Sequence, residues 1–346
     1  MFITNLYSIS PQKTFDNSFF DGEVKSFFGN KYYVQEPDYS ALIPKGLLRR
    51  LGKAVKIGLG AGIPLIETKK DIDGIILGTA TGGLNECYKF LNQIVKYDEG
   101  TLTPTSFVQS TPNSIAGHLA LITNNIGYNN THIGMGLAFE SAILDAFLLF
   151  EEGEVAKLLI GSVDEASEHN YNIENFANYF KSIEIDSTNL LNCDSQGSVR
   201  GEGAAMFIVS NEKENAICEL ADVHQFTYPN DKNIEKRAID FLEKNNMNID
   251  DIGGLVLGFN GDNRYDFWYN DLINSFPETN IYTYKNLVGE YPTASGFATW
   301  LAAHILAGKI IPSEAIYKNA SRLPQNILIY NNYQGTQHGF ILMKAV

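Results

Sequence analysis

A corner built from two glycines is the place in this sequence where the backbone could come closest to a ligand. Gly134 and Gly136 flank Met135, between a short apolar strand and a buried helix. The first turn of a helix presents unpaired N–H groups and a partial positive charge, which favour an anion or a polarised carbonyl. Glycine allows both a sharp turn and a close approach of the backbone. The stretch 103–167 therefore predicts a corner that faces a ligand.

The other residues that could do chemistry form no recognisable metal or nucleotide site. The six histidines are too scattered for a ligand cluster. The turn at Thr79-Ala-Thr-Gly-Gly has neither a Walker lysine nor a GxGxxG spacing, so it does not indicate nucleotide binding. The cysteines lack CxxC spacing, which argues against a zinc site and a disulfide framework. We predict no metal and no cofactor. The cysteines are Cys87, Cys193 and Cys218.

Three successive motifs resemble the β-ketoacyl synthases of the thiolase superfamily. They are the Ala116-Gly-His-Leu helix, the strand that runs into the Gly134-Met-Gly corner, and the strand Gly161-Ser-Val-Asp-Glu-Ala. Gly201-Glu-Gly-Ala is also very similar to the strand that ends the first half of those enzymes. The resemblance implies an α/β protein with a thiolase-like fold, in which two related βαβ-type halves form a five-layered αβαβα unit.

The same resemblance implies that the reacting groups of the family are mostly missing. A decarboxylating condensation needs a thiolate that holds the acyl chain and donors that stabilise an enolate oxygen. By register the cysteine position falls on Gly136, and the two histidine positions correspond to Asn260 and Glu290. The family lysine is present as Lys285, and the gate aromatic corresponds to Tyr333. We therefore name no catalytic residue and expect no condensation by the usual covalent route.

Alternative roles remain open for several of these residues. Asn260 could donate a hydrogen bond to a carbonyl or could satisfy a loop backbone. Glu290 and Lys285 are expected to form a compensated buried pair, since an unpaired buried charge is costly. His118 lies on an apolar helix and is expected to be a core residue. The helix 137–150 is either core or, by the resemblance, a border of the acyl tunnel. The candidate substrate contacts are Met135, Gly136, Phe139, Asn260, Lys285 and Tyr333.

Charge and length exclude some classes of partner. The chain has 346 residues and a net charge of −14, which argues against nucleic acid or an anionic membrane as the main partner. No signal pattern and no apolar run of membrane-spanning length is present, so we expect a cytoplasmic protein. Basic residues alternate with apolar ones over 42–66, which predicts an amphipathic helix. Its basic face is either a solvated surface or a docking surface for an acidic carrier protein.

Strand and helix patterns repeat between the two halves of the chain. A first strand is expected over 1–9, and the helix–strand–glycine pattern around Asp73 recurs around Asp250. A polar connection at 212–215 separates the repeats. We therefore predict a first thiolase-like half over residues 1–215, with the ketoacyl-synthase N-terminal character, and a second over 216–346, packed as one unit.

Three functions are compatible with these patterns. The favoured hypothesis is a non-condensing subunit similar to the chain-length factors of type II polyketide and aryl-polyene systems. Such a subunit would form a heterodimer with an active ketosynthase through the strand 129–135 and would shape the acyl tunnel, while an acyl carrier protein would dock mainly on the partner. The alternatives are an atypical acyltransferase or decarboxylase that acts on acyl or malonyl thioesters without a cysteine, and a homodimeric acyl-binding protein.

Overall fold

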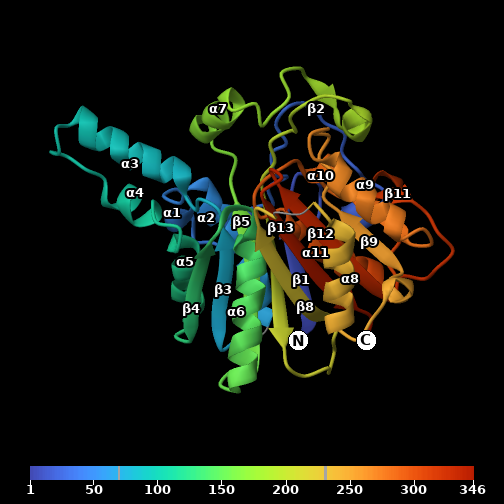
Figure 1. Cartoon of the computed structure of the whole chain (residues 1–346). Coiled ribbons are helices and arrows are strands. Elements are labelled where there is room, and N and C mark those ends of the chain that lie inside the picture. The colour runs from blue at the N-terminus through green and yellow to red at the C-terminus, as the bar shows by residue number, and fades with distance from the viewer. Residues whose placement is uncertain (69–70, 230–231) are drawn as a thin grey trace.

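The computed structural model describes residues 1–68, 71–229 and 232–346 (Figure 1). Its helices are α1 (Lys45–Leu48), α2 (Lys53–Thr68), α3 (Leu84–Lys96), α4 (Pro104–Gln109), α5 (Ser114–Thr123), α6 (Ala138–Glu152), α7 (Glu168–Phe176), α8 (Ile234–Lys244), α9 (Asp266–Ser275), α10 (Lys285–Val288) and α11 (Ser295–Leu306). Its strands are β1 (Phe2–Ile9), β2 (Phe28–Gly29), β3 (Gly74–Thr79), β4 (Tyr128–Ile133), β5 (Lys157–Asp164), β6 (Ile185–Asp186), β7 (Gly203–Ser210), β8 (Cys218–Thr227), β9 (Gly254–Leu257), β10 (Asn280–Thr283), β11 (Ile316–Lys318), β12 (Asn326–Tyr333) and β13 (Gln337–Lys344).

The main sheet repeats one pattern of strands twice. Within the described residues its order is β11-β10-β9-β12-β13-β8-β1-β7-β5-β3-β4. The strands β4, β3 and β5 are parallel, and β7 and β1 follow as antiparallel neighbours. The strands β10, β9, β12, β13 and β8 have the same arrangement. We call β1–β7 with their helices the N half and β8–β13 with theirs the C half; the internal duplication predicted from the sequence is present.

The two half-sheets meet at a short antiparallel pairing. Phe2 pairs with Glu219 and Ile3 with Cys218, where β1 runs alongside β8. The chain passes from β7 to β8 between Ser210 and Cys218, so the boundary expected at residue 215 lies in this connection. The division of the chain at that residue stays a prediction.

Helices cover both half-sheets on the outside and fill the space between them. The central layer consists of α6 and α11, whose buried side chains, such as Phe139 and Leu301, form one core with residues of both halves. The helices α2 and α5 pack on the outer face of the N half, and α8 and α9 on that of the C half. These helix pairs lie at opposite sides of the molecule (Figure 1). The predicted five-layered αβαβα arrangement is confirmed.

The helix expected over 42–66 is interrupted. It consists of α1 and α2, with a break over 49–52. The side chain of Gln109 stabilises this break, because its Oε1 accepts from the Gly52 N–H at 2.6 Å and its Nε2 donates to the Arg50 carbonyl at 2.8 Å. Sequence periodicity could not predict this contact, because Gln109 belongs to another helix, α4.

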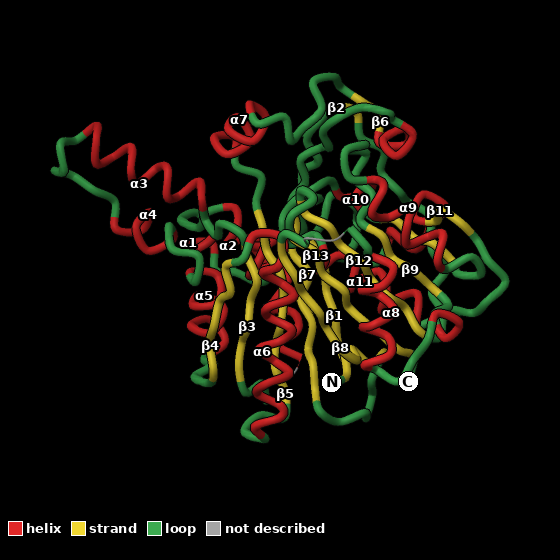
Figure 2. Tube along the Cα trace, viewed as in Figure 1, coloured by secondary structure: helices red, strands yellow, loops and turns green. Residues whose placement is uncertain are grey.

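Two segments project from the layered body. The helices α3 and α4 form a hairpin that extends away from the N half, and α7 stands above the sheet near the short pair β2–β6 (Figure 2). The hairpin follows the C-terminal end of β3, and α7 follows the C-terminal end of β5. They therefore flank the end of the sheet at which the Gly134–Gly136 corner also lies.

Candidate functional site

The predicted corner exists, but a different residue makes the turn. After β4 the chain passes through a 3₁₀ turn, η3 (Met135–Leu137), and enters α6 at Ala138. Met135 has φ = 51°, in the left-handed region, while Gly134 has φ = −153°. A residue with a side chain in that region costs about 1–2 kcal/mol. The turn therefore places backbone strain at Met135, and Gly136 is needed for another reason.

Gly136 is required because Tyr333 fills the space that a side chain at this position would occupy. A Cβ atom built on Gly136 would lie 2.3 Å from Cβ and 2.6 Å from Cγ of Tyr333. Real Cβ atoms essentially never come closer than 3.0 Å to another heavy atom. Tyr333 is buried at the end of β12, and burial raises the pKa of its hydroxyl well above the usual range. A cysteine at position 136 would not fit unless Tyr333 moved.

The polar groups of the corner are already hydrogen-bonded within the chain. The Gly136 N–H donates to Oε1 of Gln337 at 2.8 Å, and Nε2 of Gln337 donates to the Gly134 carbonyl at 3.2 Å. A backbone N–H that stabilises an oxyanion must be free to point at the substrate oxygen. Gln337 occupies this N–H, so the corner offers no such donor in this conformation. The sequence analysis did not identify Gln337, which lies about 200 positions further along the chain.

The three C-half residues of the predicted site do come together. Nζ of Lys285 lies 2.8 Å from Oε2 of Glu290, and Nδ2 of Asn260 donates to the same oxygen at 2.6 Å. Lys285 also donates to the Asn332 carbonyl at 3.2 Å, next to Tyr333. Lys285, Glu290 and Asn260 are all buried. The expected buried pair is present, and its amide partner Asn260 is bonded to it instead of facing a ligand.

Phe139 lies away from this constellation. Its side chain is fully buried in the central core, where its ring centroid is 5.8 Å from that of Phe207. Met135 is partly exposed on the other side of the corner. His118 bonds the Ser114 carbonyl of its own helix through Nδ1 at 2.7 Å, and its ring is only partly buried. The structure thus places Gly136 and Tyr333 beside the Lys285 group and leaves Phe139 in the core.

A small polar cavity adjoins the site. Its volume is about 20 Å³, which is room for about one water molecule. The ion pair between Arg200 and Glu174, with Nη1 to Oε2 at 3.1 Å, forms part of its wall together with Tyr333 and Glu290. Sequence reasoning missed Arg200 and Glu174, although Arg200 directly precedes the Gly201-Glu-Gly-Ala motif. The cavity is too small for an acyl thioester without rearrangement.

A buried carboxyl group lies where the two halves meet. Glu140 of α6 is completely buried, and an interaction with the hydroxyl of Ser295 on α11 offsets only part of the effect of burial on its pKa. Its Oε1 is so close to Gly339 of β13 that a Cβ there would lie 2.6 Å away. Burial raises the pKa of Glu140 to about 7. Nothing in the local sequence pattern distinguishes Glu140 from an ordinary solvent-facing helix residue.

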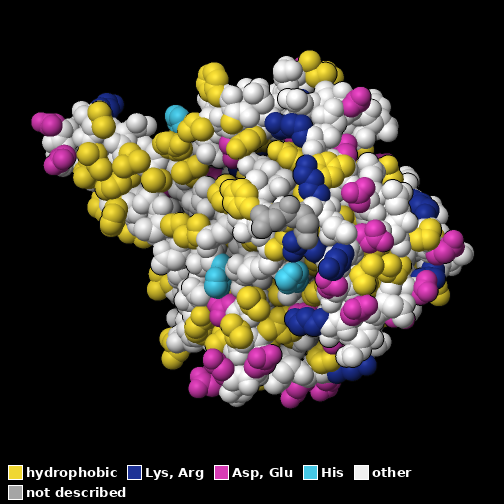
Figure 3. Space-filling view, viewed as in Figure 1, with side chains coloured by type: hydrophobic (Ala, Val, Ile, Leu, Met, Phe, Trp, Pro, Cys, Tyr) yellow, Lys and Arg dark blue, Asp and Glu magenta, His cyan; other side chains and the backbone are white. Residues whose placement is uncertain are grey.

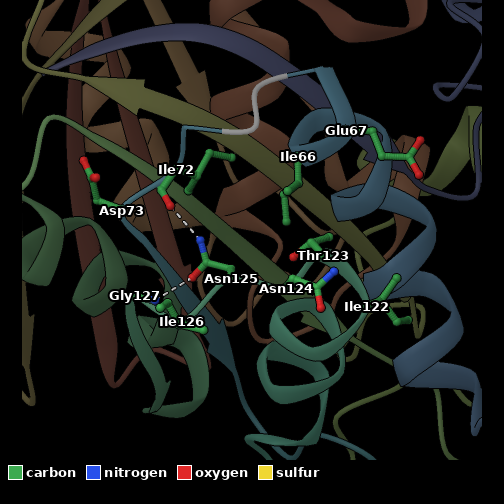
Figure 4. Close-up of a pocket in the computed structure, with 10 residues that line it drawn as sticks. All are labelled: Ile66, Glu67, Ile72, Asp73, Ile122, Thr123, Asn124, Asn125, Ile126 and Gly127. Atoms are coloured by element: carbon green, nitrogen blue, oxygen red, sulfur yellow. Dashed lines mark hydrogen bonds between the residues drawn. The ribbon is translucent and has the colours of Figure 1, made fainter.

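A cavity of larger volume is remote from these residues. It has a volume of about 650 Å³ and lies between the C-terminal end of α2 and the turn that joins α5 to β4 (Figure 4). Asn125 stabilises this turn, because its Nδ2 donates to the Ile72 carbonyl at 2.6 Å and its Oδ1 accepts from the Gly127 N–H at 3.1 Å. The cavity faces the starts of β3 and β4, whereas the corner follows the end of β4. Volume alone therefore does not locate the site.

Two further features were searched for among the described residues, a metal-binding group and a membrane-spanning helix. Among the residues that it describes, no group of three or more histidine, cysteine or acidic side chains is arranged to hold a metal ion. No helix in the described ranges has the length and hydrophobicity of a membrane span.

Comparison with known proteins identifies the fold. Residues 30–182, somewhat under half of the chain, match the family model described as "Beta-ketoacyl synthase, N-terminal domain". No curated protein matches the sequence. The structure is similar to a β-ketoacyl synthase from Burkholderia phymatum STM815, with 14% identity and a TM-score of 0.80 over 100% of this chain and 99% of that chain.

Two similar structures contain a chain-length factor. The ishigamide ketosynthase/chain length factor has 12% identity and a TM-score of 0.82, covering 100% of this chain and 98% of that chain. The ketosynthase ApeO in complex with its chain length factor ApeC, from Xenorhabdus doucetiae, has 17% identity and a TM-score of 0.79, with 100% and 98% covered. The chain therefore has the mixed α/β thiolase-like ketosynthase fold over its full length.

Proposed function

We propose that this chain is a non-condensing ketosynthase-like subunit that acts as a chain-length factor does. The observation that carries the proposal is the contact between Gly136 and Tyr333. The nucleophile position lacks a thiol, and the ring of Tyr333 occupies the space that a thiol would need. Gln337 bonds the adjacent N–H, and Glu290 pairs with Lys285. These contacts keep the site closed, so that the residues at the family's reacting positions pack against and bond one another instead of a substrate.

A subunit of this kind needs a partner, and the N half has a surface suited to one. The strand β4 is an edge of the main sheet, and an open edge presents unpaired backbone groups to another chain. Ile126 and Ile133 are exposed at the two ends of β4. Hydrophobic side chains also gather over the α3–α4 hairpin (Figure 3). Those exposed there include Leu91, Val95, Phe107 and Val108.

The proposed partner is an active ketosynthase in fatty-acid or polyketide-type biosynthesis. Two of the similar structures are described as a ketosynthase with a chain-length factor, and this likeness motivates the choice. The growing chain would be held by the partner and would run along the shared interface, beside Met135 and the start of α6. An acyl carrier protein would dock mainly on the partner. The exposed basic residues of this chain, Lys45, Arg49 and Arg50, provide a secondary contact at most.

Native mass spectrometry of the tagged chain isolated from its source cells tests this proposal. We expect a one-to-one complex with a second ketosynthase-like chain that contains a nucleophile cysteine. Thioester turnover by the isolated chain would contradict the proposal and support the cysteine-independent acyltransferase or decarboxylase. A homodimer that binds acyl carrier protein, with neither turnover nor a partner, would support an acyl-binding protein instead.

A further inference from the structure

A polar cluster lies directly behind the open edge strand. Tyr128, Asn130 and His132 alternate along β4, so their side chains share the face of the sheet that α6 covers. Asp145 of α6 accepts from Tyr128 Oη at 3.1 Å and from Asn130 Nδ2 at 3.0 Å, and its Oδ2 lies 2.7 Å from His132 Nε2. We call these four residues the Asp145 cluster.

The cluster has one negative charge that can be neutralised. Asp145 is its only acid, so one substitution by asparagine removes that charge. Glu152, at the end of α6, is the other charged group that acts on Tyr128, whose pKa is raised by burial, by Asp145 and by Glu152. The neighbouring strand β3 has no titratable residue, and α5 has only His118, whose ring bonds its own helix. Tyr128, Asn130 and His132 therefore all hold the single carboxylate of the cluster.

A second copy of the chain would place two such clusters side by side. In an isologous dimer the same patch occurs on both subunits. If two β4 strands pair antiparallel, the two-fold axis is perpendicular to the sheet, so both α6 helices lie on the same face. Each Asp145 cluster then approaches its symmetry mate within the width of a few strands, which lie about 4.8 Å apart. Like charges at such a distance repel and disfavour the homodimer.

We propose that the Asp145 cluster selects the partner at β4: it rejects a second copy of this chain and accepts a different chain with a basic or hydrogen-bond-donating side chain opposite Asp145. This inference rests on the proposed function, because it assigns β4 to the heterodimer interface. Oδ1 of Asp145 is the more weakly bonded oxygen of the carboxylate, since the hydrogen bond that it accepts from Tyr128 is long at 3.3 Å. Replacing Asp145 by asparagine removes the repulsion and permits self-association.

Sedimentation velocity of the full chain at pH 8.0 tests the inference. We expect the Asp145→Asn chain to self-associate about tenfold more tightly than the wild type, because the substitution removes both of the nearby like charges and with them a repulsion of that size. Asp240→Asn, an exposed acid on α8, removes the same charge elsewhere and should change nothing.

The result separates failure of this inference from failure of the proposed function. An Asp145→Asn chain that self-associates no more than the Asp240→Asn chain would overturn the inference. If a ketosynthase partner is still captured and Ile133→Asp removes it, the interface assignment stands and only the role of the cluster is wrong. If Ile133→Asp changes neither partner binding nor self-association, the assignment of β4 to an interface fails, and with it this part of the proposed function.

Discussion

The N half and the C half share a strand pattern but end in different sheet edges. In the C half, β11 pairs antiparallel with β10 and covers its edge. The ring of Tyr317 on β11 stacks on Phe259 at 5.4 Å between centroids, which fixes this short strand. The N half has no corresponding strand within the described residues, so β4 remains an open edge. Since proteins normally cover or blunt their edges, the difference supports the proposal that another chain covers β4.

The halves also differ in what they contribute to the site. The N half supplies a corner with no side chain at Gly136, and the C half supplies the charged pair Lys285–Glu290 and the two residues that close the corner, Tyr333 and Gln337. The C half therefore fills the space beside Gly136, where the N half supplies only backbone. Four variants would break or sharpen this comparison.

The largest effect is expected in the C half, at the buried pair. Lys285→Met should lower the free energy of unfolding by about 3–5 kcal/mol, because it leaves Glu290 buried without its cation. The double variant Lys285→Met/Glu290→Leu should recover most of this loss. Urea denaturation measures both, with the exposed Lys309→Met as the matched control. Equal losses in the single and double variants would show that the pair is not coupled.

The next effect is expected where the halves meet. The folded-state pKa of Glu140, about 7, is above the ordinary glutamate value of 4.5, so the folded protein binds this proton more tightly than the unfolded chain. Stability should therefore fall as the pH rises through the window from 4.5 to 7 and stay lower above it. Glu140→Gln should remove this penalty, which is about 3 kcal/mol by the usual conversion.

Thermal or urea unfolding from pH 4.5 to 8.5 checks the prediction for Glu140. Glu151→Gln, on the exposed side of the same helix, is the control. If the wild type and Glu140→Gln have parallel stability curves over the whole range, Glu140 is not a buried acid with a raised pKa.

The edge of the N half should respond to a charge at an exposed apolar position. Ile133→Asp should weaken binding of the ketosynthase partner by about 2–3 kcal/mol, as expected for an anchor side chain at an interface. Ile310→Asp introduces the same charge at another exposed isoleucine and should have no effect. Pull-down followed by titration calorimetry measures the difference. Equal affinities for the two variants would argue against β4 as the interface.

The smallest effect is expected at the corner itself. Gly136→Ala should cost about 1–3 kcal/mol through overpacking against Tyr333. Combining it with Tyr333→Ala should reduce that cost, which a double-mutant cycle of unfolding free energies would reveal. Gly136→Cys alone should not accept an acyl group. A Gly136→Ala chain as stable as the wild type would show that the Tyr333 side chain moves away at little cost in free energy and that the site can open.

The sequence predicted the fold and the internal duplication. Each of these depends on local order along the chain: glycine at the corner, apolar periods of strands and helices, and motifs in a fixed succession. It also predicted the pairing of Glu290 with Lys285, since the two are close in sequence and a lone buried charge would be costly. It did not predict the break between α1 and α2, because Gln109 reaches that break from another helix.

Tertiary structure alone decided that the site is closed. Tyr333 and Gln337 lie about 200 residues from the corner that they fill, and no periodicity relates them to Gly136. In the same way, the capped edge of the C half, the open edge β4 and the convergence on Asp145 arise only when the strands take their order in the sheet. Local sequence specifies each strand and helix, whereas long-range packing determines which side chains occupy the space between them.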